Sequence, residues 1–220
     1  MQIPILTIDG PSGAGKGTVS RRVAKKIGWH YLDSGSIYRS VAIALMQNNA
    51  DITNTNQILS VASTLELAFE CNDELTVKLN GQDVTSQLAT ETTGNVASQI
   101  AVIPEVRRTL LQKQKDFKQP PGLVADGRDM GTVVFPEAKI KVFLTASAAE
   151  RAQRRYKQLM EKGIDVNIAQ ITSEIEARDA RDKERAAAPL VQAPDAHYID
   201  SSGMTIDEVI AQVLSLVPQL

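Results

Sequence analysis

The feature that most constrains this chain of 220 residues is a glycine-rich run near its start, Gly10-Pro11-Ser12-Gly13-Ala14-Gly15-Lys16. The run fits the pattern G-x-x-x-x-G-K. The apolar segment 3–8 before it predicts a buried strand, and the apolar residues Val19, Val23 and Ile27 predict a helix from Lys16 to Gly28. A glycine-rich turn without a ligand is the alternative, and the strand-loop-helix context disfavours it. The pattern therefore predicts a phosphate-binding loop, or P-loop.

In such a loop the backbone N–H groups close around a phosphate, and the helix that follows directs its positive end toward it. The lysine can then reach the β- and γ-phosphates of ATP. The loop residues expected to bind ATP are Gly10, Pro11, Ser12, Gly13, Ala14, Gly15, Lys16, Gly17 and Thr18.

Gly17 occupies the position at which this pattern normally has Ser or Thr, whose hydroxyl binds Mg²⁺. Direct coordination of Mg²⁺ by a hydroxyl at this position is therefore not expected, and we expect the ion to be held mainly by the nucleotide, water and Asp126. Thr18 and Asp126 are the candidate protein contacts. Asp126 ends the apolar run 123–125, as a Walker-B-type carboxylate does, but a helix cap or loop aspartate fits the pattern equally well.

Alternating strand and helix signals along the chain predict an α/β fold of the P-loop NTPase type, a parallel sheet flanked by helices. Further strands are expected at 29–32, 123–126, 140–144 and 197–200. Helices are expected after an N-cap at Ser36, at 94–103, at 104–117, from a capping box at Ser147 to about 162, from near 167 past Arg185, and after Thr205. Between them, Asn80-Gly81 separates two alternating runs, which predicts an antiparallel β insert over 64–84.

Arginines follow two of the predicted strands. Arg39 comes shortly after Ser34-Gly35, and Arg128-Asp129 directly follows the strand that ends at Asp126. Ligands of open parallel sheets bind beyond the carboxyl ends of the strands, and guanidinium groups hold phosphate in a bidentate manner. A single arginine of this kind is more often a surface ion pair. The two together, beside a P-loop, predict a second ligand that carries a phosphate.

The late helices carry a stripe that changes from apolar to charged. The apolar part of the stripe consists of Ile168, Ile171 and Ile175. The same helix face then continues with the charged residues Arg178, Asp182 and Arg185. A solvated helix with i,i+4 ion pairs is one interpretation, and a basic lid that closes over the phosphates is the other. Beside a P-loop, the lid is favoured. Arg151 and Arg155 on the preceding helix fit the same role or ordinary surface charge.

The composition argues against several other classes of protein. The formal net charge of −2 gives no basic field for polymeric nucleic acid or an anionic membrane. Cys71 is the only cysteine, so an intramolecular disulfide is impossible. We expect a cytoplasmic monomer without signal peptide or membrane span. His30 and His197 fall in predicted strands and are interpreted as structural, which leaves no evident general base.

Three stretches of the sequence, one of which contains the P-loop, resemble stretches of one family. DGPSGAGKGT (9–18), LDSGSIYR (32–39) and ADGRDMGT (125–132) together resemble bacterial cytidylate kinases, which are nucleoside monophosphate kinases. Residues 176–189 and the β insert are similar as well. The resemblance covers essentially the whole chain, and the order and spacing of the motifs make it specific.

The resemblance implies transfer of the ATP γ-phosphoryl group to CMP or dCMP with Mg²⁺. It implies a core (1–36, 104–150 and 186–220), a monophosphate-binding lobe (37–103) with its β insert, and a lid (151–185). By position, cytosine would contact Ser34, Ser98, Arg107 and Asp129, and the acceptor phosphate would contact Arg39 and Arg128. Arg178 and Asp182 would meet the sugar, Arg185 would neutralise the transferred group, and Arg151 with Arg155 would cover ATP. The catalytic set is Lys16, Arg128, Arg178 and Arg185.

The chemistry of cytosine agrees with this assignment, because a carboxylate such as Asp129 accepts from its 4-amino group and an arginine donates to its acceptors. Two other functions stay open. One is a kinase for a different small acceptor, and the other is a nucleotide-binding regulatory module that hydrolyses little.

Overall fold

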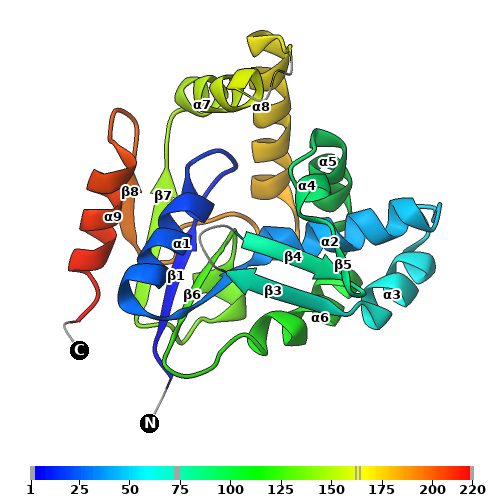
Figure 1. Ribbon diagram of the computed structural model, residues 1–220, viewed down its shortest axis with the longest axis horizontal. Helices are drawn as coiled ribbons and strands as arrows, with labels where there is room; N and C mark the ends of the chain where they lie inside the picture. Colours follow the sequence, from blue (N-terminus) through cyan, green and yellow to red (C-terminus); the bar gives the residue numbers. More distant parts are fainter. Residues whose placement is uncertain (1–2, 72–74, 162, 164, 219–220) are drawn as a thin grey trace.

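The computed structural model describes residues 3–71, 75–161, 163 and 165–218. Its centre is a five-stranded parallel sheet with the order β2-β6-β1-β7-β8 (Figure 1). The strands are β1 (Ile5–Asp9), β2 (His30–Asp33), β6 (Leu123–Gly127), β7 (Ile140–Thr145) and β8 (His197–Asp200). Every residue of β1 and β6 is buried, as the mostly apolar sequences of these inner strands require. The predicted parallel sheet is confirmed.

Helices cover both faces of this sheet. The helices α1 (Lys16–Ile27) and α9 (Ile206–Ser215) pack on one face, where Val19, Val23 and Val209 belong to one apolar cluster. The other face is covered by α2 (Ser34–Gln47), α6 (Pro104–Lys115) and the short π-helix η1 (Met130–Val134). The register aligns Asp33 with Asp126 and Asp9 with Gly127. The carboxyl groups of Asp9, Asp33 and Asp126 therefore all lie at the carboxyl ends of the strands.

A second unit follows α2 and contains α3 (Thr55–Thr64), β3 (Leu67–Cys71), β4 (Leu75–Leu79), β5 (Gln82–Asp83), α4 (Thr85–Leu88) and α5 (Glu91–Ile100). Its strands form an antiparallel sheet in the order β3-β4-β5. Asn80 and Gly81 connect β4 to β5 with positive φ values of 49° and 81°, as a tight hairpin turn requires. The predicted β insert is confirmed.

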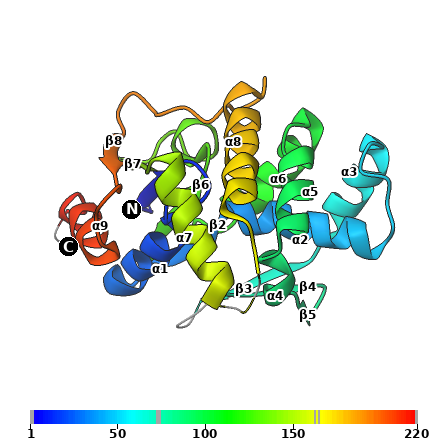
Figure 2. The same cartoon turned by 90° about the horizontal axis from the view of Figure 1, so that it is seen from above.

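The helices α7 (Ala148–Glu161) and α8 (Ile168–Glu184) rise beyond the carboxyl ends of the strands (Figures 1 and 2). They pack on each other through a small apolar cluster that contains Ala152, Leu159, Ile171 and Ile175. Seen from above, α7 lies over α1 and α8 lies beside α5 (Figure 2). These two helices therefore flank the place where a ligand of the sheet would bind.

Several predicted boundaries were wrong. Asp33, not Ser36, caps α2, because its Oδ1 accepts from the Ser36 backbone N at 3.0 Å. The helix expected from residue 94 begins at Glu91, after an N-cap at Thr90. The helix expected to continue past Arg185 ends at Glu184, because Arg185 adopts an extended backbone. The α3 helix was not predicted.

Of the two predicted capping boxes, one is complete and the other is formed only in part. The box at Thr205 and Glu208 is complete. At the start of α7, the Ser147 Oγ accepts from the Glu150 N at 3.1 Å, but the Glu150 carboxylate pairs with Arg154.

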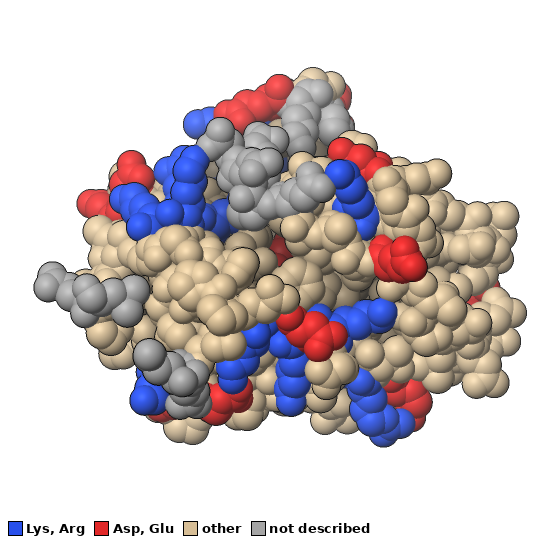
Figure 3. Space-filling view, turned by 60° about the horizontal axis from the view of Figure 1, so that its bottom comes forward, with Lys and Arg blue, Asp and Glu red and all other residues tan. Residues whose placement is uncertain are grey.

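The surface mixes charges of both signs. On the face drawn in Figure 3, Lys and Arg side chains lie beside Asp and Glu side chains. Within the described residues, no helix combines the length and the apolar character that a bilayer crossing demands.

Candidate active site

The P-loop connects β1 to α1 and has the backbone that its glycines allow. A Cβ on Gly10 would lie 1.9 Å from the Leu144 carbonyl oxygen, so this close approach excludes any side chain. Gly15 caps α1 with a φ of 88°. The buried Lys16 extends back across the loop, where its Nζ donates to the Pro11 carbonyl oxygen at 2.8 Å.

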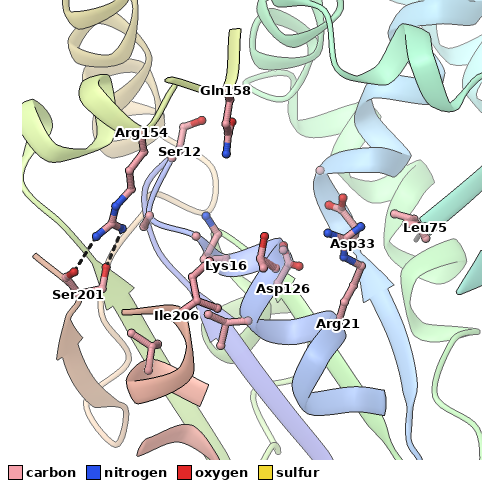
Figure 4. Close-up of a pocket in the computed structure, with 18 of the residues that line it drawn as sticks. Ser12, Lys16, Arg21, Asp33, Leu75, Asp126, Arg154, Gln158, Ser201 and Ile206 are labelled. Carbon is pink, nitrogen blue, oxygen red and sulfur yellow. Dashed lines mark hydrogen bonds between the residues drawn. The ribbon is translucent and has the colours of Figure 1, made fainter. Parts of the chain in front are cut away.

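The P-loop forms one wall of a cavity of about 740 Å³, which we call the donor cavity (Figure 4). Seven Lys or Arg side chains line it, against three Asp or Glu side chains. They are Lys16, Arg21, Arg39, Arg128, Arg154, Lys157 and Arg178, with Asp33, Asp126 and Glu161. This excess of positive charge contrasts with the mixed outer surface and suits a polyanionic ligand.

Burial disfavours the charged forms of two basic side chains in this cavity. It lowers the pKa of Lys16 to about 7, and the neighbouring Arg128 acts in the same direction. Burial also lowers the pKa of Arg178 to about 9, again with Arg128 as the next cause. Phosphate oxygens placed between these cations would stabilise their charged forms, so the electrostatics indicate an anion-binding site.

Asp126 lies inside β6 and lines the donor cavity, so the structure places it where a Walker-B-type carboxylate lies and not at a helix cap. Its Oδ2 accepts from the Tyr31 hydroxyl at 2.5 Å. Burial and then the charge of Asp33 raise the pKa of Asp126 to about 7. A cation beside this carboxyl would favour its charged form.

A second cavity adjoins the first and is called the acceptor cavity. Eight side chains that the sequence predicted for the site line it: Ser34, Ser98, Arg107, Arg128, Asp129, Arg178, Asp182 and Arg185. The two cavities share Gly35 and the side chains of Arg128 and Arg178. Segments far apart in sequence, from α2, α5, α6, β6 and α8, thus meet in one place.

Ion pairs hold the acceptor cavity together. The Arg128 Nε donates to the Asp182 Oδ2 at 2.7 Å, and Arg107 binds Asp129 through its Nη2. An Arg185 nitrogen lies 3.6 Å from the Asp129 Oδ1. Asp129 is 3% exposed, so its carboxylate is a buried acceptor between two guanidinium groups.

Three predicted arginines have different surroundings. Arg39 lines the donor cavity and donates to the Leu88 carbonyl oxygen. Arg155, on α7, binds Glu91 and the Ala89 carbonyl oxygen, and with Arg39 and Arg178 it lines a smaller cavity between α7, α8 and α5.

Arg151 is buried, and its guanidinium is occupied by protein groups. It makes two bonds to Asp179, at 3.1 and 2.6 Å, and donates to the carbonyl oxygens of Ser12 and Ala146 at 3.0 Å. In the structure it therefore supports the P-loop from behind, and a direct contact with ATP stays a prediction.

The sequence comparison decides the family. A model of the cytidylate kinase family matches residues 6–219. The chain belongs to the cytidylate kinase family. It is 54% identical to a cytidylate kinase from Methylococcus capsulatus, over 98% of this chain and 97% of that protein. It is 53% identical to one from Aeromonas salmonicida, over 98% and 94% of the two chains. The resemblance stated from the motifs is confirmed.

A solved structure supports the fold of this cytidylate kinase family member. The crystal structure of an uncharacterized protein from Eubacterium ventriosum superimposes with a TM-score of 0.51 at 12% identity, over 98% of this chain and 97% of the other. At that identity the likeness concerns the fold alone.

Sequence reasoning overlooked several residues of the site. The Asp9 carboxylate accepts from the backbone N of Met130 and of Gly131 at 2.8 Å each and so holds the turn after Asp129. Arg154 lines the donor cavity and donates to the Ser201 carbonyl oxygen at 2.7 Å. Arg154 lies three residues after Arg151, outside the four-residue spacing that links Arg151 to Arg155, so that spacing did not single it out. Asp9, directly before Gly10, was visible as a polar end to an apolar strand.

Proposed function

We propose that this chain transfers the γ-phosphoryl group of ATP to CMP or dCMP, giving CDP or dCDP. The observation that supports this most is the adjoining pair of cavities with a common wall of Arg128 and Arg178. ATP on the P-loop and a nucleoside monophosphate in the acceptor cavity would bring their phosphates together at that wall. Membership of the cytidylate kinase family supports the choice of acceptor.

Charge stabilisation and positioning carry the reaction. Lys16 would contact the β- and γ-phosphates, while Arg128 and Arg178 would face both the donor and the acceptor phosphates. Arg185, 8% exposed and beside Asp129, would neutralise the transferred group. The three guanidinium groups cannot act as bases, and phosphoryl transfer of this kind depends little on one.

The acceptor cavity has the groups that cytosine needs. The Asp129 carboxylate can accept from the 4-amino group, and the Arg107 guanidinium can donate to the ring acceptors. Ser34 and Ser98 line the same cavity, Arg39 would hold the acceptor phosphate, and Asp182 would meet the sugar. Uracil would set its O4 against the carboxylate, and such a mismatch between buried polar groups is costly.

Mg²⁺ fits the donor cavity as a companion of ATP. The buried carboxyl of Asp126, which lines this cavity together with Lys16, is a hard oxygen donor of the kind that Mg²⁺ accepts alongside phosphate and water. Asp126 would hold the ion, with Thr18 as a second candidate, and the bound ion would neutralise phosphate charge. Among the described residues there is no cluster of three or more acidic, His or Cys side chains that could hold a metal by itself.

The division into core (1–36, 104–150, 186–220), monophosphate-binding lobe (37–103) and lid (151–185) is part of this proposal. The separate antiparallel sheet and the projecting helices α7 and α8 support it. The cytoplasmic location and the monomeric state remain predictions.

An acceptor panel tests the proposal. With ATP and Mg²⁺, coupled ADP release is measured for CMP, dCMP, UMP, AMP and GMP, and without acceptor. We expect release that depends on CMP or dCMP. Equal release without acceptor would favour a regulatory module, and dependence on another compound would favour a kinase of different specificity.

A further inference from the structure

Gln114 is a buried polar residue behind the acceptor cavity. It lies on α6 and is 2% exposed. It stands two turns after Arg107 on the same face of the helix, but it does not line the cavity itself. A buried amide at such a place needs partners for both its donor and its acceptor atoms.

Both ends of the Gln114 amide have a defined partner. Its Nε2 donates to the Leu110 carbonyl oxygen at 3.3 Å, and its Oε1 accepts from the Ser34 Oγ at 2.7 Å. The reversed amide would set Oε1 against the Leu110 carbonyl oxygen, so two acceptors would face each other. The Leu110 carbonyl therefore fixes the orientation of the amide and presents an acceptor to Ser34.

This contact decides what Ser34 can offer to a ligand. A serine hydroxyl has one hydrogen and two lone pairs. The hydrogen is donated to Gln114, and Ser34 is 4% exposed with its remaining surface on the acceptor cavity. Toward the cavity, Ser34 is thus left as an acceptor only.

We propose that Gln114 is a specificity-determining positioning residue that keeps Ser34 as an acceptor for the 4-amino group of cytosine. This inference rests on the proposed function and deepens it. Cytosine carries two N–H donors on N4, which Ser34 and Asp129 can share. Uracil carries O4 there, an acceptor that the fixed Ser34 hydroxyl cannot satisfy. Without Gln114, the hydroxyl is free to rotate and donate to O4.

The test compares Gln114→Leu with the wild-type chain by kcat/KM for CMP and for UMP. We expect the CMP:UMP ratio to fall on the order of tenfold, chiefly through faster use of UMP. Gln112→Leu, an exposed position on the same helix, is the matched control and should keep the wild-type ratio. Thermal unfolding of each variant is recorded, and Gln114→Met serves as a near-isosteric second variant if Gln114→Leu does not fold.

A double-mutant cycle separates this role from mere support of α6. In a Ser34→Ala background, Gln114→Leu should leave the CMP:UMP ratio unchanged, because there is no hydroxyl left to orient. An unchanged ratio in both Gln114 variants would overturn the inference, as would an equal fall of the ratio in the Ser34→Ala background. A wild-type chain that does not use CMP at all would instead overturn the proposed function.

Discussion

At the scale of single residues, Lys16 lies at the centre of the site, where burial disfavours its charged form. Its pKa is lowered to about 7 because the ammonium group is buried beside Arg128. A group held in this way contributes little to folding but is placed to meet the charge that develops on the phosphates.

We therefore predict that Lys16→Ala lowers kcat by roughly 10²- to 10³-fold while the urea midpoint of unfolding changes little. Steady-state ADP release and urea titration measure the two effects. Lys139→Ala, at an exposed position, is the control and should retain both values. Full turnover in Lys16→Ala would contradict the assigned role.

Asp9 gives a prediction for pH. Burial raises its pKa to about 6, against an ordinary value of 3.8, although the N–H groups of Gly131 and Met130 act in the opposite direction. The folded chain therefore binds this proton more tightly than the unfolded chain, and the contribution of Asp9 to stability declines as the pH rises through this interval.

The Asp9→Asn variant does not titrate in this range. An amide has only one acceptor oxygen, so the variant also loses one of the two hydrogen bonds from the Met130 and Gly131 backbone, and this loss changes the free energy of unfolding by the same amount at every pH. The free energy of unfolding of the wild type relative to Asp9→Asn should fall between pH 4 and pH 7, by up to roughly 3 kcal/mol. Urea unfolding across that range measures it, with the exposed Asp116→Asn variant as control. A difference that grows with pH would refute the prediction.

At the scale of elements, the pair between Arg151 and Asp179 joins α7 to α8 and both to the P-loop. The Arg151 side chain is 5% exposed and that of Asp179 is 14% exposed, so loss of one partner leaves a largely buried charge. Removal of a single partner from such a pair typically costs about 3–5 kcal/mol, whereas an apolar replacement of both is often tolerated.

Arg151→Met should accordingly destabilise the chain by about 3–5 kcal/mol, and Arg151→Met with Asp179→Leu should recover most of that loss. The double variant still lacks the bond to the Ser12 carbonyl oxygen, so we expect a raised KM for ATP at near-normal stability. Urea unfolding and ATP kinetics provide the two measurements. A double variant as unstable as the single one would argue against a paired role.

At the scale of the whole molecule, the two cavities should act as one. A compound in which adenosine and cytidine are joined by five phosphates would occupy both and bridge Arg128 and Arg178. It should raise the melting temperature more than ATP and CMP do when each is added alone at the same concentration.

Differential scanning fluorimetry measures this effect, with the uridine analogue as a matched and weaker ligand. A shift no larger than that of ATP alone would show that the cavities are not filled together.

Local patterns predicted much of this molecule from its sequence. The P-loop, the parallel strands and the hairpin at Asn80-Gly81 follow from short-range rules and were confirmed. The α3 helix was missed, although Asn54 caps it and Ile58 with Ala62 is buried at helical spacing, because polar residues dominate its remaining sequence.

The partners of each arginine could not be predicted in the same way. Arg151 and Arg155 are four residues apart and lie on the same face of α7. Arg151 is nevertheless buried against Asp179 of α8, whereas Arg155 binds Glu91 of α5. The difference depends on the direction in which α7 crosses its neighbours. Likewise, the contact of Ser34 with Gln114 joins residues 80 positions apart, and only the packing of α2 on α6 brings it about.

The common wall of Arg128 and Arg178 limits how such an enzyme can diversify. A substitution in that wall would disturb the recognition of both nucleotides simultaneously, so few changes there can be neutral. New acceptor bases can be accommodated only at residues that line the acceptor cavity and not the donor cavity, such as Ser34 and Asp129, where a variant is free to alter one substrate while the other is left untouched. Directed evolution toward a different pyrimidine should therefore gather its mutations at the residues that line the acceptor cavity alone.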